Sequence, residues 1–175
     1  MSESKYFSYY LPILLFITML VDAHISSGLM SLFAVPMTFT SNLTLLLFMF
    51  STFKVGKVYL TSWAAVIGLL YDSYFYNVIG INLILYPLLV LLMYLLFEHV
   101  IPNTFTLILS FIVFVTLLSI GRVLLLTAFN LTNTTFLDFF TRNLTPTLLI
   151  NTLYITLFVI PLSKLFGLKK KKKAR

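Results

Sequence analysis

The sequence contains no cysteine, two histidines and few charged residues, and each shortage excludes a class of protein. Without cysteine, disulfide bonds, thiolate catalysis and cysteine-ligated metal sites are excluded. Charged residues make up 10% of the chain, whereas a soluble domain carries roughly 25%. Hydrophobic residues make up 60%, and water cannot solvate so apolar a surface. The sequence therefore predicts an integral membrane protein.

The hydrophobic residues are concentrated in runs that predict about six membrane-spanning helices. A spanning helix needs roughly 20 apolar residues, and in lipid its amide groups can bond only within the helix. The expected segments are 6–21, 38–53, 58–71, 79–97, 105–129 and 147–168. We expect an all-α polytopic bundle forming a single domain over residues 1–168, followed by a polybasic cytoplasmic tail at 169–175.

Two stretches fit this pattern poorly. The run 58–71 has about 14 residues and reaches about 21 Å as a helix, less than the roughly 30 Å hydrocarbon core. We expect it either to begin earlier, near Thr52, or to be surrounded partly by other helices. Residues 25–35 are also apolar, and they predict a re-entrant or interfacial piece after the first helix.

The lysines and arginines predict the orientation, because they concentrate on the cytoplasmic side of membrane proteins. With both termini in the cytoplasm and about six crossings, ten of the 12 basic residues lie inside. Arg142 alone lies outside, and Arg122 lies within a helix. The tail has five lysines: Lys169, Lys170, Lys171, Lys172 and Lys173. We expect them to anchor the chain to anionic lipids; nucleic-acid binding is not expected, because no aromatic residues are interleaved.

Arg122 is the most unusual residue at membrane depth, where an ionisable side chain suggests a function. It lies about seven residues from the outer end of its helix, roughly 10 Å deep. It can pair with Asp72 or with Asp22, or extend alone to the outer headgroups. If Arg122 and Asp72 form an ion pair, exchanging the two residues should rescue the defect that each single neutralisation causes.

Small and polar residues near the helix ends are the other candidates for structural or partner contacts. Glycine lets helices approach closely, and an amide in lipid favours an interhelical hydrogen bond. The candidates are Gly68, Asp72, Gly80, Asn82, Arg122, Pro146 and Asn151. Glu98 and His99 are adjacent and point in different directions on a helix, so they form no acid–base pair. We expect no catalytic, cofactor-binding or metal-binding residue, and no enzyme.

Two short stretches resemble a known family. The sequence Gly68-Leu69-Leu70-Tyr71-Asp72, followed by a short polar turn, Gly80 and a long apolar helix, resembles the signature of the rod shape-determining protein MreD family. The run from Pro146 to Asn151 resembles that family's entry into its last helix. Asp22 stands where the family often has a polar residue ending the first helix.

The resemblance implies a fold, a function and partners. The implied fold is similar to the six-helix substrate-binding subunits of energy-coupling-factor transporters. The implied function is that of a non-enzymatic, cofactor-free component of the bacterial cell-wall elongation machinery in the plasma membrane, which scaffolds wall-synthesis proteins and helps determine cell shape. The implied partners are an MreC-type single-span membrane protein and, further, MreB, a RodA-type transglycosylase and a class B penicillin-binding protein.

Two alternatives remain open at the level of the sequence. The first is a vitamin-binding membrane subunit of an energy-coupling-factor transporter. Such subunits dock through small residues on their first helix, whereas the run Leu11 to Val21 has no alanine or glycine, which argues against transport. The second alternative is a small lipid-modifying enzyme that uses Asp72 and Glu98.

Overall fold

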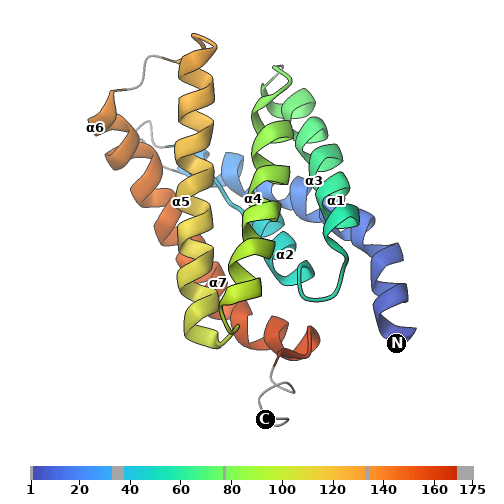
Figure 1. Ribbon diagram of the computed structural model, residues 1–175. Helices are drawn as coiled ribbons and strands as arrows, with labels where there is room; N and C mark the ends of the chain where they lie inside the picture. Colours follow the sequence, from blue (N-terminus) through green and yellow to red (C-terminus); the bar gives the residue numbers. More distant parts are fainter. Residues whose placement is uncertain (1, 33–37, 77, 133–134, 169–175) are drawn as a thin grey trace.

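The computed structural model describes residues 2–32, 38–76, 78–132 and 135–168, and within these ranges every regular element is helical (Figure 1). The elements are α1 (Ser2–Leu32), α2 (Leu43–Ser51), α3 (Lys57–Tyr71), the π-helix η1 (Asp72–Tyr76), α4 (Ile81–His99), α5 (Thr104–Ala128), α6 (Phe136–Asp138), the π-helix η2 (Phe139–Leu144) and α7 (Thr145–Leu165). The all-α prediction is confirmed.

Four helical stretches within the described residues are long and apolar enough to cross a membrane. They are Tyr6–Ser31, Ile81–His99, Thr104–Ala128 and Phe136–Leu165. The last includes α6, η2 and α7, so the final helical stretch begins well before the predicted residue 147. The second and third predicted segments are not among these four stretches.

The second segment is a broken helix. Residues 38–42 have no regular structure, and α2 contains 9 residues in place of the predicted helix over 38–53. The sequence Thr40-Ser41-Asn42 explains the late start, because such side chains favour caps over helix interiors. The nine residues of α2 reach only about 13 Å as a helix, less than half of the roughly 30 Å hydrocarbon core.

The third segment is longer than predicted at its C-terminal end, and its N-terminal end lies close to the predicted residue 58. α3 begins at Lys57, so the predicted start near Thr52 is wrong. Its helical path continues through Asp72 into η1 and reaches Tyr76. Together α3 and η1 cover about 30 Å at the usual rise per residue. The expected cover by other helices is present on one face, where Leu60 and Ala64 are fully buried.

The first helix is much longer than predicted. α1 continues to Leu32, so no separate re-entrant piece follows it in the described residues, and Asp22 lies inside the helix and not at its end. The additional turns contain Ala23 and Gly28. The argument against a transporter subunit from the absence of small residues in the first helix therefore no longer holds.

One end of the bundle gathers the beginning of α1, the turn after α2 and the ends of α4 and α7 (Figure 1). The ring centroids of Phe7 and Phe166 lie 5.2 Å apart, and those of Phe53 and Phe97 lie 4.7 Å apart. Lys54 Nζ donates to the Leu165 carbonyl at 2.9 Å. We call this the basic end, because Lys54, Lys57 and Lys164 lie in or beside these segments.

Candidate functional site

Gly68 allows α3 and α4 to approach each other at the end opposite the basic end. A Cβ atom added at Gly68 would lie 2.4 Å from the Asn82 carbonyl oxygen and 2.8 Å from the Leu83 nitrogen, both of them backbone atoms. Any larger residue must therefore displace the beginning of α4. Gly68 places that beginning within reach of Asp72, which lies one turn further along the same helix face.

Asp72 caps α4 across the turn between the two helices. Its fully buried carboxylate accepts hydrogen bonds from the backbone N–H groups of Gly80 at 3.0 Å, Asn82 at 2.8 Å and Leu83 at 3.0 Å. These donors would otherwise be unsatisfied at a helix start. The negative charge also lies at the positive end of the helix dipole. Gly80 has a φ of 129°, which is why glycine is needed there.

Asn82 connects this cap to Arg122. Its Nδ2 donates to Asp72 at 2.8 Å, and its Oδ1 accepts from Arg122 Nε at 2.9 Å. Arg122 Nη2 donates to the Tyr86 hydroxyl at 3.2 Å, and the guanidinium carbon lies 5.5 Å from the Tyr71 ring centroid. Figure 1 shows that α3, α4 and α5, which carry these residues, lie side by side.

This geometry corrects the predicted contacts of Arg122. The predicted direct contact of Arg122 with Asp72 is replaced by a bridge: the Asn82 amide lies between the two residues and bonds to both. Nor does Arg122 extend alone to the surface, because only 5% of it is exposed. The sequence identified Asp72, Asn82 and Arg122 as candidates, but it did not predict the order in which they are connected.

Asp22 caps α2 in the same way that Asp72 caps α4. Its buried carboxylate accepts from the N–H groups of Leu43 at 2.7 Å and Thr44 at 2.8 Å, and from the Ser41 hydroxyl at 2.5 Å. The N-cap residue Asn42 makes no side-chain capping bond of its own. An aspartate from the preceding long helix therefore replaces the local cap at both sites.

Residues 38–42 lie beside η2 and the beginning of α7. The N–H groups of alternate residues donate to these two elements: Thr38 to the Arg142 carbonyl of η2 at 2.9 Å, Thr40 to the Thr147 hydroxyl of α7 at 3.3 Å, and Asn42 to Asn151 Oδ1 of α7 at 2.9 Å. Asn151 Nδ2 also donates to the Thr40 carbonyl at 2.7 Å. Side chains of α7 thus satisfy backbone groups that lipid cannot satisfy.

Pro146 explains why one of these acceptors is available. Proline has no N–H, so it cannot donate to the carbonyl four residues earlier. That carbonyl belongs to Arg142, and it accepts from Thr38 instead. The structure therefore gives both Pro146 and Asn151 a role in holding residues 38–42.

The structure uses these polar groups in hydrogen bonds between segments of the chain. Glu98 and His99 are exposed at the other end of α4, and His99 Nδ1 bonds only to the Leu95 carbonyl of its own helix. No group of three or more metal-ligating side chains occurs among the described residues. Lysines 169–173 lie outside the described residues, so their predicted role as a lipid anchor stays a prediction.

Sequence reasoning did not identify Ser41, Thr147 and Tyr86 as members of these clusters. Runs of Ser, Thr and Asn inside an otherwise apolar segment were the available signal, because these residues disfavour helix interiors. Residues 38–42 contain such a run, Thr40-Ser41-Asn42.

Comparison with known proteins identifies the family of this chain. The family model described as rod shape-determining protein MreD matches residues 6–169. A curated relative, the cell shape-determining protein MreD of Streptococcus pneumoniae (strain ATCC BAA-255 / R6), is 35% identical over 139 residues, covering 79% of this chain and 84% of the relative. No solved structure matches, so the likeness to energy-coupling-factor subunits stays a prediction. The chain belongs to the rod shape-determining protein MreD family.

Proposed function

We propose that this protein is a non-enzymatic scaffold of the bacterial cell-wall elongation machinery and helps to determine cell shape by organising wall-synthesis proteins. The observation that carries the proposal is the family match along residues 6–169, together with a relative named for cell-shape determination. The fold supports it, because the outer helix faces are apolar and the buried carboxylates of Asp22 and Asp72 accept hydrogen bonds from backbone N–H groups of the same chain.

A scaffold needs helices held in fixed positions, and the polar contacts of the interior supply this. Asp72 ties α3 to α4, Asn82 ties α4 to Arg122 of α5, and Asp22 ties α1 to α2. Asn151 of α7 holds the segment before α2. A buried network of satisfied hydrogen bonds rigidifies and specifies one arrangement of helices. Single-span partners would then dock on fixed outer faces.

The proposed orientation has both termini in the cytoplasm. The basic end, with Lys54 and Lys57, would face the cytoplasm, as lysines do in membrane proteins. The proposed partners are an MreC-type single-span protein and, further, MreB, a RodA-type transglycosylase and a class B penicillin-binding protein. The cytoplasmic partner would meet the basic end, and partners acting on the wall would meet the opposite end.

Depletion of the protein, followed by microscopy and by co-purification from gently solubilised membranes, tests this proposal. We expect altered cell shape and recovery of single-span wall-synthesis proteins with the full-length chain. Re-expression of the wild-type protein should restore shape, and an unrelated membrane protein of similar size should recover none of these partners. Unchanged shape together with the absence of any such partner would refute the scaffold.

A further inference from the structure

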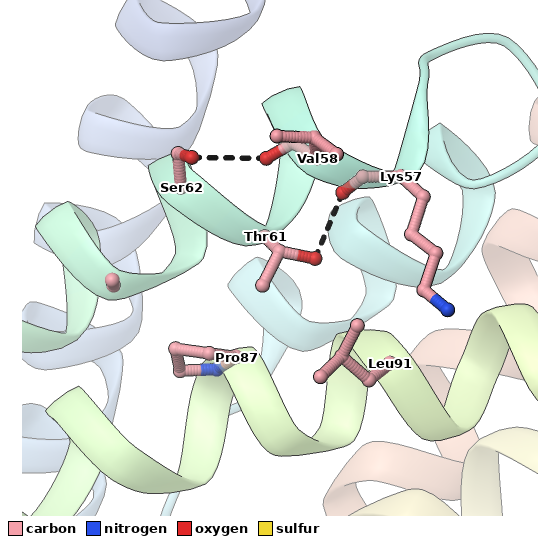
Figure 2. Close-up of a pocket in the computed structure, with 7 residues that line it drawn as sticks. Lys57, Val58, Thr61, Ser62, Pro87 and Leu91 are labelled. Carbon is pink, nitrogen blue, oxygen red and sulfur yellow. Dashed lines mark hydrogen bonds between the residues drawn. The ribbon is translucent and has the colours of Figure 1, made fainter.

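A groove runs between α3 and α4 on the outside of the bundle, beginning at the basic end. Its volume is about 350 Å³, within the roughly 300–1,000 Å³ of small-molecule sites. α4 contributes Pro87 and Leu91, which face Thr61 across the gap, and Lys57 lies at one end (Figure 2). The groove is therefore lined mainly by apolar groups, and the Lys57 ammonium lies at one end of it.

The hydroxyl groups beside the groove are already bonded within α3. Thr61 donates to the Lys57 carbonyl at 2.8 Å, and Ser62 donates to the Val58 carbonyl at 3.0 Å (Figure 2). Their donor protons are therefore not directed at a ligand. What remains along the groove is hydrocarbon from Ala65, Pro87 and Leu91. This chemistry favours an alkyl chain over a polar ligand.

The charge at the mouth of the groove is uncompensated. The Lys57 ammonium forms no ion pair or hydrogen bond with any described residue. By contrast, Lys54 at the same end bonds to the Leu165 carbonyl. α3 has no acidic residue in its first turn, and Gly56 supplies no side-chain cap. The positive end of the helix dipole therefore adds to the lysine charge.

We propose that this groove binds one anionic phospholipid, with its phosphate at Lys57 and one acyl chain along Ala65, Pro87 and Leu91. Basic pockets between transmembrane helices on the cytoplasmic side recognise anionic headgroups. The positive charge of Lys57 favours an anionic ligand, and the apolar lining of the groove favours a lipid with an acyl chain over a free anion. The inference goes beyond the proposed scaffold function and rests only on its orientation, with the basic end in the cytoplasm.

Native mass spectrometry of the full-length protein, released from detergent micelles with added phosphatidylglycerol or phosphatidylcholine, tests the proposal. We expect phosphatidylglycerol to be retained preferentially. Lys57→Gln should weaken its binding about fivefold, the contribution of one lysine near a lipid surface. Lys164→Gln removes the same charge from an exposed site at the same end of the bundle, and it should leave binding unchanged.

A second variant tests the contribution of the apolar groove separately from that of the Lys57 charge. Ala65→Leu fills the groove without changing charge, and it should also reduce phosphatidylglycerol binding while the protein keeps its thermal unfolding temperature and its size-exclusion profile. Equal losses for Lys57→Gln and Lys164→Gln would show non-specific attraction and overturn the proposal. So would equal retention of the two lipids, or a co-purified protein helix cross-linking to position 65.

Discussion

Two buried aspartates have the same task in this protein. Asp22 and Asp72 each come from a long helix and cap the beginning of the next helix in the chain. Inside a membrane such N–H groups have no water to bond to, and leaving one unsatisfied costs several kcal/mol. The carboxylates therefore stabilise the turns of the bundle, which explains an otherwise costly charge in an apolar environment.

Exchanging Asp72 and Arg122 should not restore the protein. Arginine has five donors and no acceptor, so at position 72 it would face the N–H groups of Gly80, Asn82 and Leu83 with more donors. We expect the double variant to unfold at a lower temperature than Asp72→Asn alone, measured in detergent by intrinsic fluorescence. This outcome is the reverse of the rescue that a direct ion pair predicts.

The control for this exchange is the surface ion pair between Arg142 and Asp138, whose atoms lie 3.2 Å apart. Both side chains are about half exposed, and such pairs contribute only about 0–1 kcal/mol. Exchanging Asp138 and Arg142 should therefore leave the unfolding temperature nearly unchanged. Full recovery of stability in the Asp72/Arg122 exchange would contradict the position of Asn82 between the two residues.

Gly68→Ala should destabilise the protein although it adds a single methyl group. The new Cβ would meet backbone atoms of Asn82 and Leu83, which cannot rotate away. Overpacking of this kind costs about 1–3 kcal/mol, and here it also moves α4 from the Asp72 cap. Thermal unfolding in detergent measures the effect. Gly28→Ala is the matched control, since its added Cβ would meet nothing within 4 Å apart from its chain neighbours and the backbone of its own helix. Equal shifts for both variants would contradict the close approach.

At the scale of the elements, the sequence predicts the elements that make their own hydrogen bonds and not those that rely on distant partners. The long apolar runs of α4 and α5 correctly predicted two spanning helices near their observed bounds. The predicted segment 38–53 is longer than α2. The beginning of α2 is fixed by Asp22 and by Asn151, and Asn151 lies 109 residues from its partner Asn42 in the sequence. Hydrophobicity along the chain carries no information about such contacts.

The same limit applies to the candidate site. Gly68 and Asp72 were identifiable because they lie on one helix face. Asn82 and Arg122 were identifiable as polar groups at membrane depth. The hydrogen bonds that join Asp72, Asn82 and Arg122 could not be predicted, because an amide between two charged groups can be recognised only once the positions of α4 and α5 are known.

Thr147→Val should loosen the segment 38–42 without breaking α7. The change removes the acceptor of the Thr40 N–H and leaves a backbone donor unsatisfied, which costs about 1–3 kcal/mol. Hydrogen exchange with mass spectrometry should show faster exchange in peptides covering residues 38–44. Thr156→Val makes the same change on the same helix, where the hydroxyl bonds only to the Thr152 carbonyl, and should leave these peptides unaffected. Equal exchange in both variants would exclude this support of the segment.

At the scale of the whole molecule, the described residues pass from end to end of the bundle six times, although only four of their helical stretches are long enough to span a membrane alone. The turn after α2 returns to the basic end, where Lys54 meets Phe7 and Phe166. η1 reaches the opposite end, where Asp72 holds Gly80. α4 then comes back, because Phe97 packs on Phe53. An even number of passes agrees with two termini on one side, as the distribution of lysines predicts.

The absence of cysteine makes this topology directly measurable, because each introduced cysteine is the only thiol in the chain. We expect Gly56→Cys and Asn103→Cys to react with a membrane-impermeant maleimide only after the membrane is permeabilised. Ile79→Cys and Leu131→Cys, exposed between helices at the opposite end, should react in intact cells. Leu45→Cys, which is fully buried in α2, should react in neither case and serves as the control. If Gly56→Cys were labelled in intact cells, the broken second segment would not carry the chain across the membrane, and the basic end would not be cytoplasmic.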